Sequence, residues 1–103
     1  MTQRQDMHKI ADHFGPENQR YKSIEECNEY IDAVRKLQHA IDLGKPPDVI
    51  ATLRLNVIEE AADAKLMLDQ VIYQLKGESD AKKMRQYKIE RTLKRIETNY
   101  YGE

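Results

Sequence analysis

Glycine and proline divide this chain into long stretches that contain neither residue. Up to residue 98 they occur as "GP" at residues 15–16, as "GKPP" at residues 44–47 and as a single glycine at position 77. Proline lacks the N–H that a helix interior needs, and glycine commonly ends a helix. The stretches between them are rich in strong helix formers such as Ala, Leu, Glu and Lys. We predict a short N-terminal preface over residues 1–14 and main helices over residues 17–43, 48–76 and 79–98.

The residues at these breaks predict how each helix ends. Gly44 is expected to stop the helix over residues 17–43, and Gly77 is expected to cap the helix over residues 48–76. Ser79 is a suitable N-cap for the last helix, because its hydroxyl can accept a hydrogen bond from a free N–H of the first turn. No stretch alternates polar and apolar residues as a strand does. The predicted class is therefore all-α.

The length of 103 residues favours a single domain, residues 1–103, with a modest core. Residues 61–75 are apolar on most of the helix circumference. Such a helix has to be covered on more than one side, which a chain of this size achieves poorly alone. We therefore expect an antiparallel helical bundle whose core is completed by oligomerisation.

Charge and cysteine content indicate the setting in which the protein works. With 17 Lys and Arg against 18 Asp and Glu, the balance favours neither a nucleic acid polymer nor an anionic membrane as a partner. The single cysteine, Cys27, cannot form an internal disulfide, which is typical of a reducing compartment. No leader-like segment and no apolar run of about 18 residues occurs. We expect a cytoplasmic protein.

Acidic residues are concentrated at two places in the predicted helices. In "SIEECNEYIDAV", a rotation of about 100° per residue places Glu26 and Glu29 together, one turn apart, beside an apolar stripe. Glu25 lies farther from that stripe and is expected to face solvent. The stripe, which we expect to be buried, consists of Ile24, Cys27, Ile31, Val34, Leu37 and Ile41.

The second cluster, "VIEEAADAKLML", repeats this arrangement. Glu60 and Asp63 border the apolar face of their helix, with the amides of Asn56 and Gln70 nearby along the same side. If the two helices are antiparallel neighbours, both acid pairs face one groove. Converging carboxylates repel unless protonated or bridged by cations, and oxygen ligands select hard ions, chiefly Mg²⁺, with Mn²⁺ possible. A solvated acidic surface produces the same spacing and remains an alternative.

The last predicted helix carries cations on one stripe. Lys88, Arg91 and Arg95 share one side within "YKIERTLKRI". If this helix folds against the other two, the stripe can neutralise phosphates that a metal leaves uncompensated; a solvated basic surface is the alternative. The three histidines do not stand at E-x-x-H spacing with the acid pairs, which argues against a di-iron carboxylate bundle.

Taken in order, "FGPENQRYKSIEECNEYIDAV", "EEAADAKLMLDQV" and "YKIERTLKRI" resemble the MazG-like nucleotide pyrophosphohydrolases of the all-α NTP pyrophosphatase superfamily. The resemblance covers about residues 14–97. It includes the E-x-x-E and E-x-x-D motifs and a closing K-x-x-R. Asn28, Tyr30 and Lys65 depart from the small or aliphatic residues that many relatives carry there.

The resemblance implies Mg²⁺-dependent hydrolysis of a nucleoside or deoxynucleoside triphosphate to the monophosphate and pyrophosphate, in nucleotide-pool housecleaning. It implies a homodimer or homotetramer. A non-catalytic oligomerisation or regulatory module that keeps the bundle is the alternative. Carried over to this chain, the resemblance implies metal ligands Glu26, Glu29, Glu60 and Asp63, with Glu26 and Glu29 also catalytic, and substrate contacts Gln19, Lys22, Lys88 and Arg91.

Overall fold

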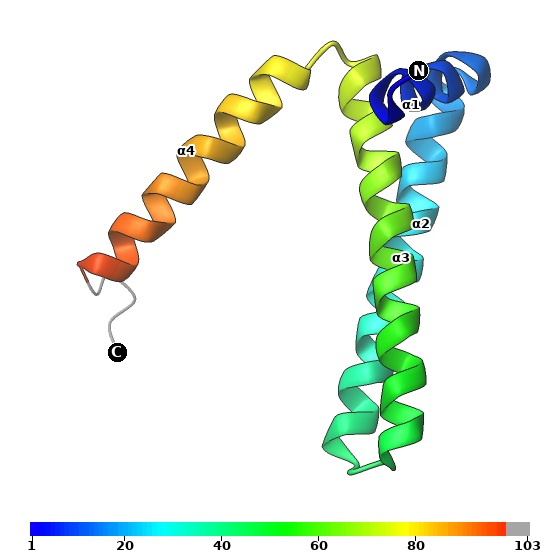
Figure 1. Ribbon diagram of the computed structural model, residues 1–103, viewed down its shortest axis with the longest axis vertical. Coiled ribbons are helices and arrows are strands. Elements are labelled where there is room, and N and C mark those ends of the chain that lie inside the picture. The colour runs from blue at the N-terminus through cyan, green and yellow to red at the C-terminus, as the bar shows by residue number, and fades with distance from the viewer. Residues whose placement is uncertain (99–103) are drawn as a thin grey trace.

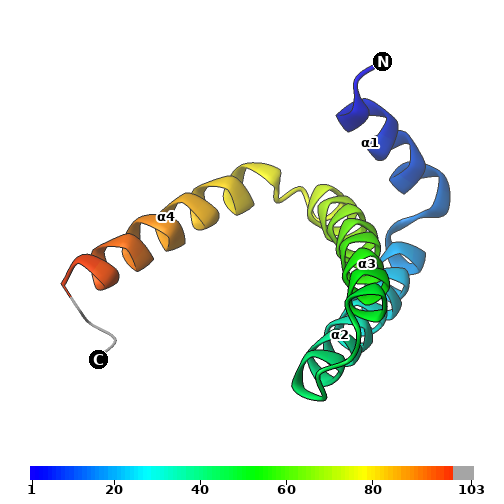
Figure 2. The ribbon, with the colours of Figure 1, turned by 60° about the horizontal axis from the view of Figure 1, so that its bottom comes forward.

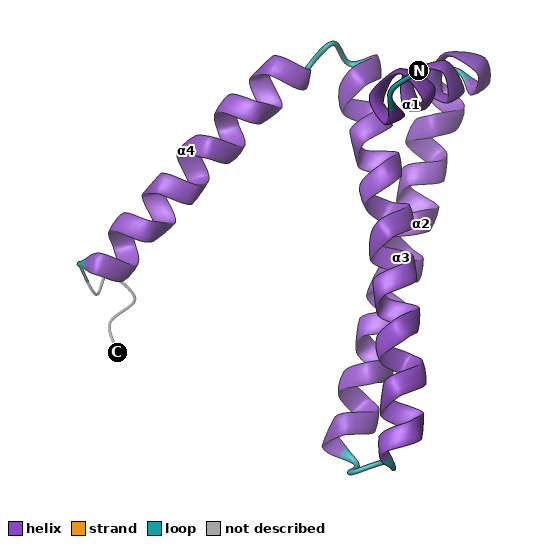
Figure 3. Cartoon of the chain, in the orientation of Figure 1, coloured by secondary structure: helices purple, strands orange, loops and turns teal. Residues whose placement is uncertain are grey.

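A computed structural model describes residues 1–98 of the chain. Within that range the protein is built from helices alone, without a strand, as predicted (Figure 3). The main helices begin and end within two residues of the expected positions. The four helices are α1 (Gln3–Phe14), α2 (Pro16–Asp42), α3 (Pro47–Gln74) and α4 (Glu78–Glu97).

The turn between α2 and α3 forms as the sequence predicts. Gly44 adopts φ +65°, in the left-handed region, and its N–H donates to the carbonyl of Ile41 over 3.0 Å. The N–H of Lys45 reaches the carbonyl of Ala40 over the same distance, which completes a Schellman ending. Pro47 then begins α3, where its missing N–H is not needed.

The ends around α4 differ from the prediction by one residue. Lys76, not Gly77, takes the left-handed conformation after α3, with φ 57°. Gly77 instead donates its N–H to the carbonyl of Ile72 over 2.9 Å. Helix α4 begins at Glu78 without a side-chain cap, so Ser79 lies inside its first turn. Gly77 therefore lies one position farther beyond the helix end than expected. Its N–H makes the second of the two hydrogen bonds that close the end of α3.

Helices α2 and α3 form a long antiparallel hairpin (Figure 1). Small side chains lie between them, since Ala33 and Ala40 on α2 and Ala64 on α3 are buried. Met67 is the one larger apolar side chain that is buried in the described part of the chain. Alanine lets two helix backbones approach closely, but it removes little apolar surface from water. The hairpin is therefore tightly paired around a thin core.

The apolar stripe expected to be buried on α2 faces outward in the single chain. Ile24 is 59% exposed and Ile31 is 42% exposed, and Val34 and Ile41 are exposed as well. The prediction of a buried stripe is wrong for the isolated hairpin. A hairpin covers only one face of each helix, and here the face lined by alanines and amides is the one that α3 covers. The bulky stripe beside it has no partner among the described residues of this chain.

Helix α4 leaves the hairpin and extends away from it (Figures 1 and 2). Its residues are all at least partly exposed. The radius of gyration is 17.5 Å, against about 13 Å for a compact domain of this length. We expected the last helix to fold against the other two; in the single chain it approaches only the end of the hairpin. No helix within residues 1–98 is long and apolar enough to cross a membrane.

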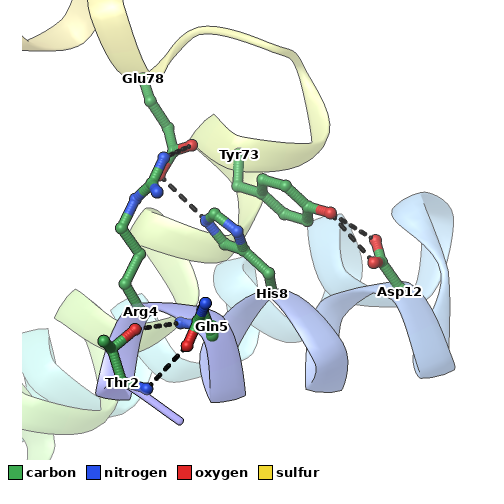
Figure 4. A network of polar contacts seen from close by, with 7 residues as sticks. All are labelled: Thr2, Arg4, Gln5, His8, Asp12, Tyr73 and Glu78. Carbon is green, nitrogen blue, oxygen red and sulfur yellow. Dashed lines mark hydrogen bonds and ion pairs between the residues drawn. The ribbon is translucent and has the colours of Figure 1, made fainter.

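Helix α1 crosses the open end of the hairpin and links it to α4 (Figure 4). Arg4 Nη2 lies 2.9 Å from Glu78 Oε1, and His8 Nε2 lies 3.1 Å from Glu78 Oε2. The His8 ring stacks on Tyr73, with centroids 3.7 Å apart, and the Tyr73 hydroxyl donates to the carboxylate of Asp12. We call Arg4, His8, Asp12, Tyr73 and Glu78 the α1 anchor.

The start of α1 was not anticipated from the sequence. Thr2 and Gln5 form a capping box: the Gln5 N–H donates to Thr2 Oγ1 over 3.1 Å, and the Thr2 N–H donates to Gln5 Oε1 over 2.8 Å. This pair begins the helix at Gln3, so that most of the predicted preface over residues 1–14 is helical. The longer helix carries Arg4 to within reach of α4.

Candidate metal centre

The antiparallel hairpin brings the two acid clusters together. Glu26 on α2 lies opposite Glu60 and Asp63 on α3, and one carboxylate oxygen of each lies within 4.8 Å of the others. This is the juxtaposition expected if the two helices are antiparallel neighbours. Three negative charges at this separation repel one another, so the arrangement needs a proton or a cation to compensate.

Burial makes the repulsion more costly. Glu26 is only 8% exposed and Glu60 is half-buried. The Oε2 atoms of both residues are buried, and neither has a hydrogen-bond donor among the described residues. A buried carboxylate oxygen without a donor loses its hydration without replacement. The two side chains thus keep acceptor capacity for a ligand, on helices that face each other.

Lys22 compensates part of the negative charge of this cluster. Its Nζ lies 3.1 Å from Glu26 Oε1 and 3.7 Å from an oxygen of Glu25. The hydrogen bond with Glu26 and the charges of Glu25 and Glu26 raise the pKa of Lys22, which keeps the ammonium group charged. One cation at the edge cannot neutralise a cluster of this size.

Glu29 is exposed, and one of its carboxylate oxygens lies within 4.8 Å of oxygens of Glu25 and Glu26. Its pKa is raised, first by the charge of Glu26, then by partial burial and by the charge of Glu60, and contacts with both carboxylates add to the effect. A protonated Glu29 can donate to either neighbour. The neighbouring negative charges therefore favour the protonated form of Glu29.

Glu25 is exposed, as expected, and it also adjoins the cluster. An oxygen of Glu25 lies within 4.8 Å of oxygens of Glu26 and Glu29. Glu25 and Glu29 are four residues apart and therefore share one side of the helix. That i,i+4 spacing was the available signal, and the residue was missed because it lies far from the apolar stripe.

Gln19 lies one turn before Lys22 and forms a buried contact toward α3. Its Nε2 donates to Gln70 Oε1, and Gln70 is almost fully inaccessible to solvent. Gln19 therefore packs between the helices in this structure. The amide pair is therefore a buried polar contact between α2 and α3.

The two cations predicted to contact substrate lie elsewhere in the chain. Lys88 and Arg91 are exposed on α4, whose described residues approach α3 but not α2. The Arg91 guanidinium lies over the ring of Tyr87, 5.6 Å from its centroid. The single chain thus brings Glu26 together with Glu60 and Asp63, and Glu29 and Lys22 adjoin Glu26. Gln19 contacts Gln70 instead, and Lys88 and Arg91 lie apart on α4.

The donor atoms of the cluster fit a hard divalent cation. Every candidate ligand is a carboxylate oxygen, and Glu26 and Glu60 each carry a buried oxygen to which no described residue donates. Oxygen donors select Mg²⁺, Mn²⁺ or Ca²⁺ over softer metals. Asp63 and Glu29 are exposed, so a cation held by Glu26 and Glu60 would remain open to a further ligand on that side.

Comparison with family models, with curated proteins and with solved structures finds no match to this chain. The fold and the carboxylate cluster therefore carry the functional interpretation: an all-α protein with groups of acidic side chains that could hold a metal ion.

Proposed function

We propose that the protein is a Mg²⁺-dependent nucleoside triphosphate pyrophosphohydrolase, with Mn²⁺ as a possible substitute. The observation that carries the proposal is the pair of buried carboxylate oxygens, Glu26 Oε2 and Glu60 Oε2, which have no donor among the described residues and belong to side chains that approach each other between α2 and α3. Such oxygens are costly in a purely structural role but suit a cation site. The resemblance of the three sequence motifs to MazG-like enzymes supports the same function.

Glu26, Glu29, Glu60 and Asp63 would hold the metal. When bound, Mg²⁺ would offset the charge of the triphosphate and acidify a coordinated water. The exposed side of the groove, at Glu29 and Asp63, is where a nucleotide can enter.

In the proposed reaction the oxygen of water forms a bond to the α-phosphorus. The bond from that phosphorus to the α–β bridging oxygen breaks, and pyrophosphate leaves with the electron pair. Glu26 or Glu29 would orient the attacking water and accept its proton. The charges of Glu26 and Glu60 raise the pKa of Glu29, which strengthens that carboxylate as a base. Lys22 and Gln19 lie beside the groove, and Lys88 and Arg91 would bind the departing pyrophosphate.

The test is incubation with a panel of NTPs and dNTPs plus Mg²⁺, with identification of the products. We expect the monophosphate and pyrophosphate. Asp63→Asn should abolish the reaction, because it removes a ligand charge at nearly constant shape. Asp48→Asn is the matched control, since Asp48 is exposed in the first turn of α3 and lies outside both carboxylate groups. Release of orthophosphate alone from every nucleotide would refute the proposed cleavage position.

We also propose that the protein works as a homo-oligomer, a homodimer or homotetramer, without a nucleic acid polymer or membrane as partner, and in the cytoplasm. The exposed apolar side chains on α2, α3 and α4 support self-association. The same observation favours the second candidate, a non-catalytic oligomerisation or regulatory module. Thermal melting with and without Mg²⁺ separates the two, because only a cation site gains stability by mass action.

A further inference from the structure

Lys22 contacts the glutamate that the two groups of carboxylates share. Its Nζ lies 3.1 Å from Glu26 Oε1. Glu26 belongs both to the group with Glu25 and Glu29 and to the group with Glu60 and Asp63. Glu26 is buried, and its other oxygen, Oε2, has no donor among the described residues. The ammonium group of Lys22 therefore satisfies one oxygen of this carboxylate and leaves the second without a partner.

A second carboxylate lies within reach of the same ammonium group. Lys22 Nζ lies 3.7 Å from Glu25 Oε1, and the side chain of Glu25 is 60% exposed, against 10% for Glu26. Glu25 and Glu26 follow Lys22 by three and four residues, so both lie one turn farther along the same side of α2. The flexible four-carbon stem of lysine allows the ammonium group to move between the two carboxylates while the helix stays unchanged.

The contact with Glu26 has the same electrostatic effect that a bound cation would have. Oxygens of Glu26, Glu60 and Asp63 lie within 4.8 Å of one another, and the charge of Lys22 offsets part of their repulsion. A divalent cation held by Glu26 offsets that repulsion with twice the charge. Two cations at one carboxylate repel each other, and solvent screens this repulsion poorly where the carboxylate is buried. Lys22 and a divalent cation therefore compete for Glu26.

We infer that Lys22 is an exchangeable counter-ion, which neutralises Glu26 in the metal-free protein and moves to Glu25 when a divalent cation binds. This inference rests on the cation site of the function proposed above and adds a means of regulating it. The exchange weakens cation binding, because the contact between Lys22 and Glu26 has to be broken first. It also leaves the ammonium group at the exposed edge of the cluster, where a phosphate of the nucleotide can reach it.

Calorimetric titration of the metal-free protein with Mg²⁺ tests the competition. In Lys22→Met the side chain stays unbranched but loses its charge. We expect the Kd for Mg²⁺ to fall by about five- to tenfold, which corresponds to the loss of a partly exposed ion pair that competes with the metal. An unchanged or higher Kd would overturn the inference.

Lys65→Met is the matched control for this titration. It removes the same charge from α3, two residues after Asp63, at a position that faces away from that aspartate. Lys65 is exposed and forms no ion pair within residues 1–98. We expect its effect on the Kd to stay below about twofold, since solvent screens an exposed charge that makes no contact. An effect as large as that of Lys22→Met would mean that the general field of the protein, and not the contact, sets the affinity.

Thermal melting provides a readout that does not depend on the titration. In EDTA, Lys22→Met should have a lower Tm than the parent, because Glu26 loses its counter-ion. At saturating Mg²⁺ this difference should disappear, because the parent no longer uses the contact. A difference that persists undiminished at saturating Mg²⁺ would show that Lys22 stays on Glu26, and would overturn the inference.

Glu25→Gln tests where the ammonium group goes. Removal of the receiving carboxylate should weaken Mg²⁺ binding, partly because the cluster loses a negative charge. The same substitution in the Lys22→Met background measures that part alone. We expect Glu25→Gln to weaken binding more in the parent than in Lys22→Met. Equal effects in the two backgrounds would show that Glu25 does not receive the ammonium group, and the exchange would be refuted.

These measurements distinguish failure of the exchange from failure of the proposed function. If Lys22→Met binds Mg²⁺ more tightly and the parent hydrolyses no nucleotide, the proposed function fails while the exchange stands. If the parent releases pyrophosphate and Lys22→Met binds Mg²⁺ no more tightly than the parent, the exchange fails while the function stands.

Discussion

Replacing Glu60 with glutamine should stabilise the metal-free protein and remove its response to Mg²⁺. Glu60 Oε2 is buried without a donor, and so is Glu26 Oε2 on the facing helix. Glu60→Gln removes one negative charge and introduces an amide that can donate to a carboxylate oxygen. Side-chain size and shape are nearly unchanged, so the thin core of the hairpin should be preserved.

The magnitude follows from the separation of the carboxylates. One carboxylate oxygen of Glu26 lies within 4.8 Å of one carboxylate oxygen of Glu60. At that distance two unit charges repel by about 3.5 kcal/mol at an effective dielectric of about 20, and by about 0.9 kcal/mol in bulk water. Glu60 is half-buried, so we expect Glu60→Gln to raise the free energy of unfolding by about 1–3 kcal/mol in EDTA. This corresponds to a Tm higher by about 5–15 °C for a domain of this size.

Mg²⁺ should reverse the order of the two Tm values, so that the parent melts at a higher temperature than Glu60→Gln. At about a hundredfold excess over Kd, a bound ligand adds about 2.7 kcal/mol to the stability of the parent. Glu60→Gln lacks one ligand charge and should gain little. The assay is circular-dichroism melting at fixed protein concentration in EDTA and in increasing Mg²⁺. Glu59→Gln, an exposed neighbour, should behave as the parent in both conditions.

Two results would refute this reasoning. A lower Tm of Glu60→Gln in EDTA would mean that the carboxylate is stabilised by contacts other than a cation. An equal Mg²⁺ response in parent and variant would mean that the buried oxygens do not bind the metal.

Further predictions concern the helix ends and the α1 anchor. Gly44→Ala should lower the free energy of unfolding by about 1 kcal/mol in urea denaturation, because φ +65° disfavours a Cβ while no atom within 4 Å would clash with it. Lys76→Gly should raise that free energy by up to about 1 kcal/mol, because the lysine has φ 57°. Burial tends to raise the pKa of Glu78, but hydrogen bonds from His8 and Arg4 outweigh it and lower that pKa. The stabilisation is therefore present above the ordinary glutamate pKa of about 4.3 and is lost as pH falls through the lower folded value. The Tm difference between the parent and Glu78→Gln should accordingly be present at neutral pH and shrink on acidification; a difference independent of pH would contradict this cause.

Several features were predictable because they depend on residues close together in the sequence. Proline and glycine act on the backbone where they stand, so the breaks at Gly44 and Pro47 could be placed from the sequence. The i,i+3 spacing of Glu26 with Glu29 and of Glu60 with Asp63 places each pair on one side of its helix. An antiparallel hairpin then suffices to make the pairs converge, and the short turn requires such a hairpin.

The sequence by itself determined the helices, their ends to within two residues, and the composition of each acid pair. Only the tertiary structure decided which face of α2 turns inward. Ala33 and Ala40 allow a closer approach to α3 than the bulky stripe of Ile24 and Ile31, so the alanine face is buried and the isoleucine face is exposed. The tertiary structure also decided the direction of α4, because Glu78 pairs with residues of α1 more than 60 positions away in the chain. Local spacing contains no information about such a contact, which arises only when distant helices meet.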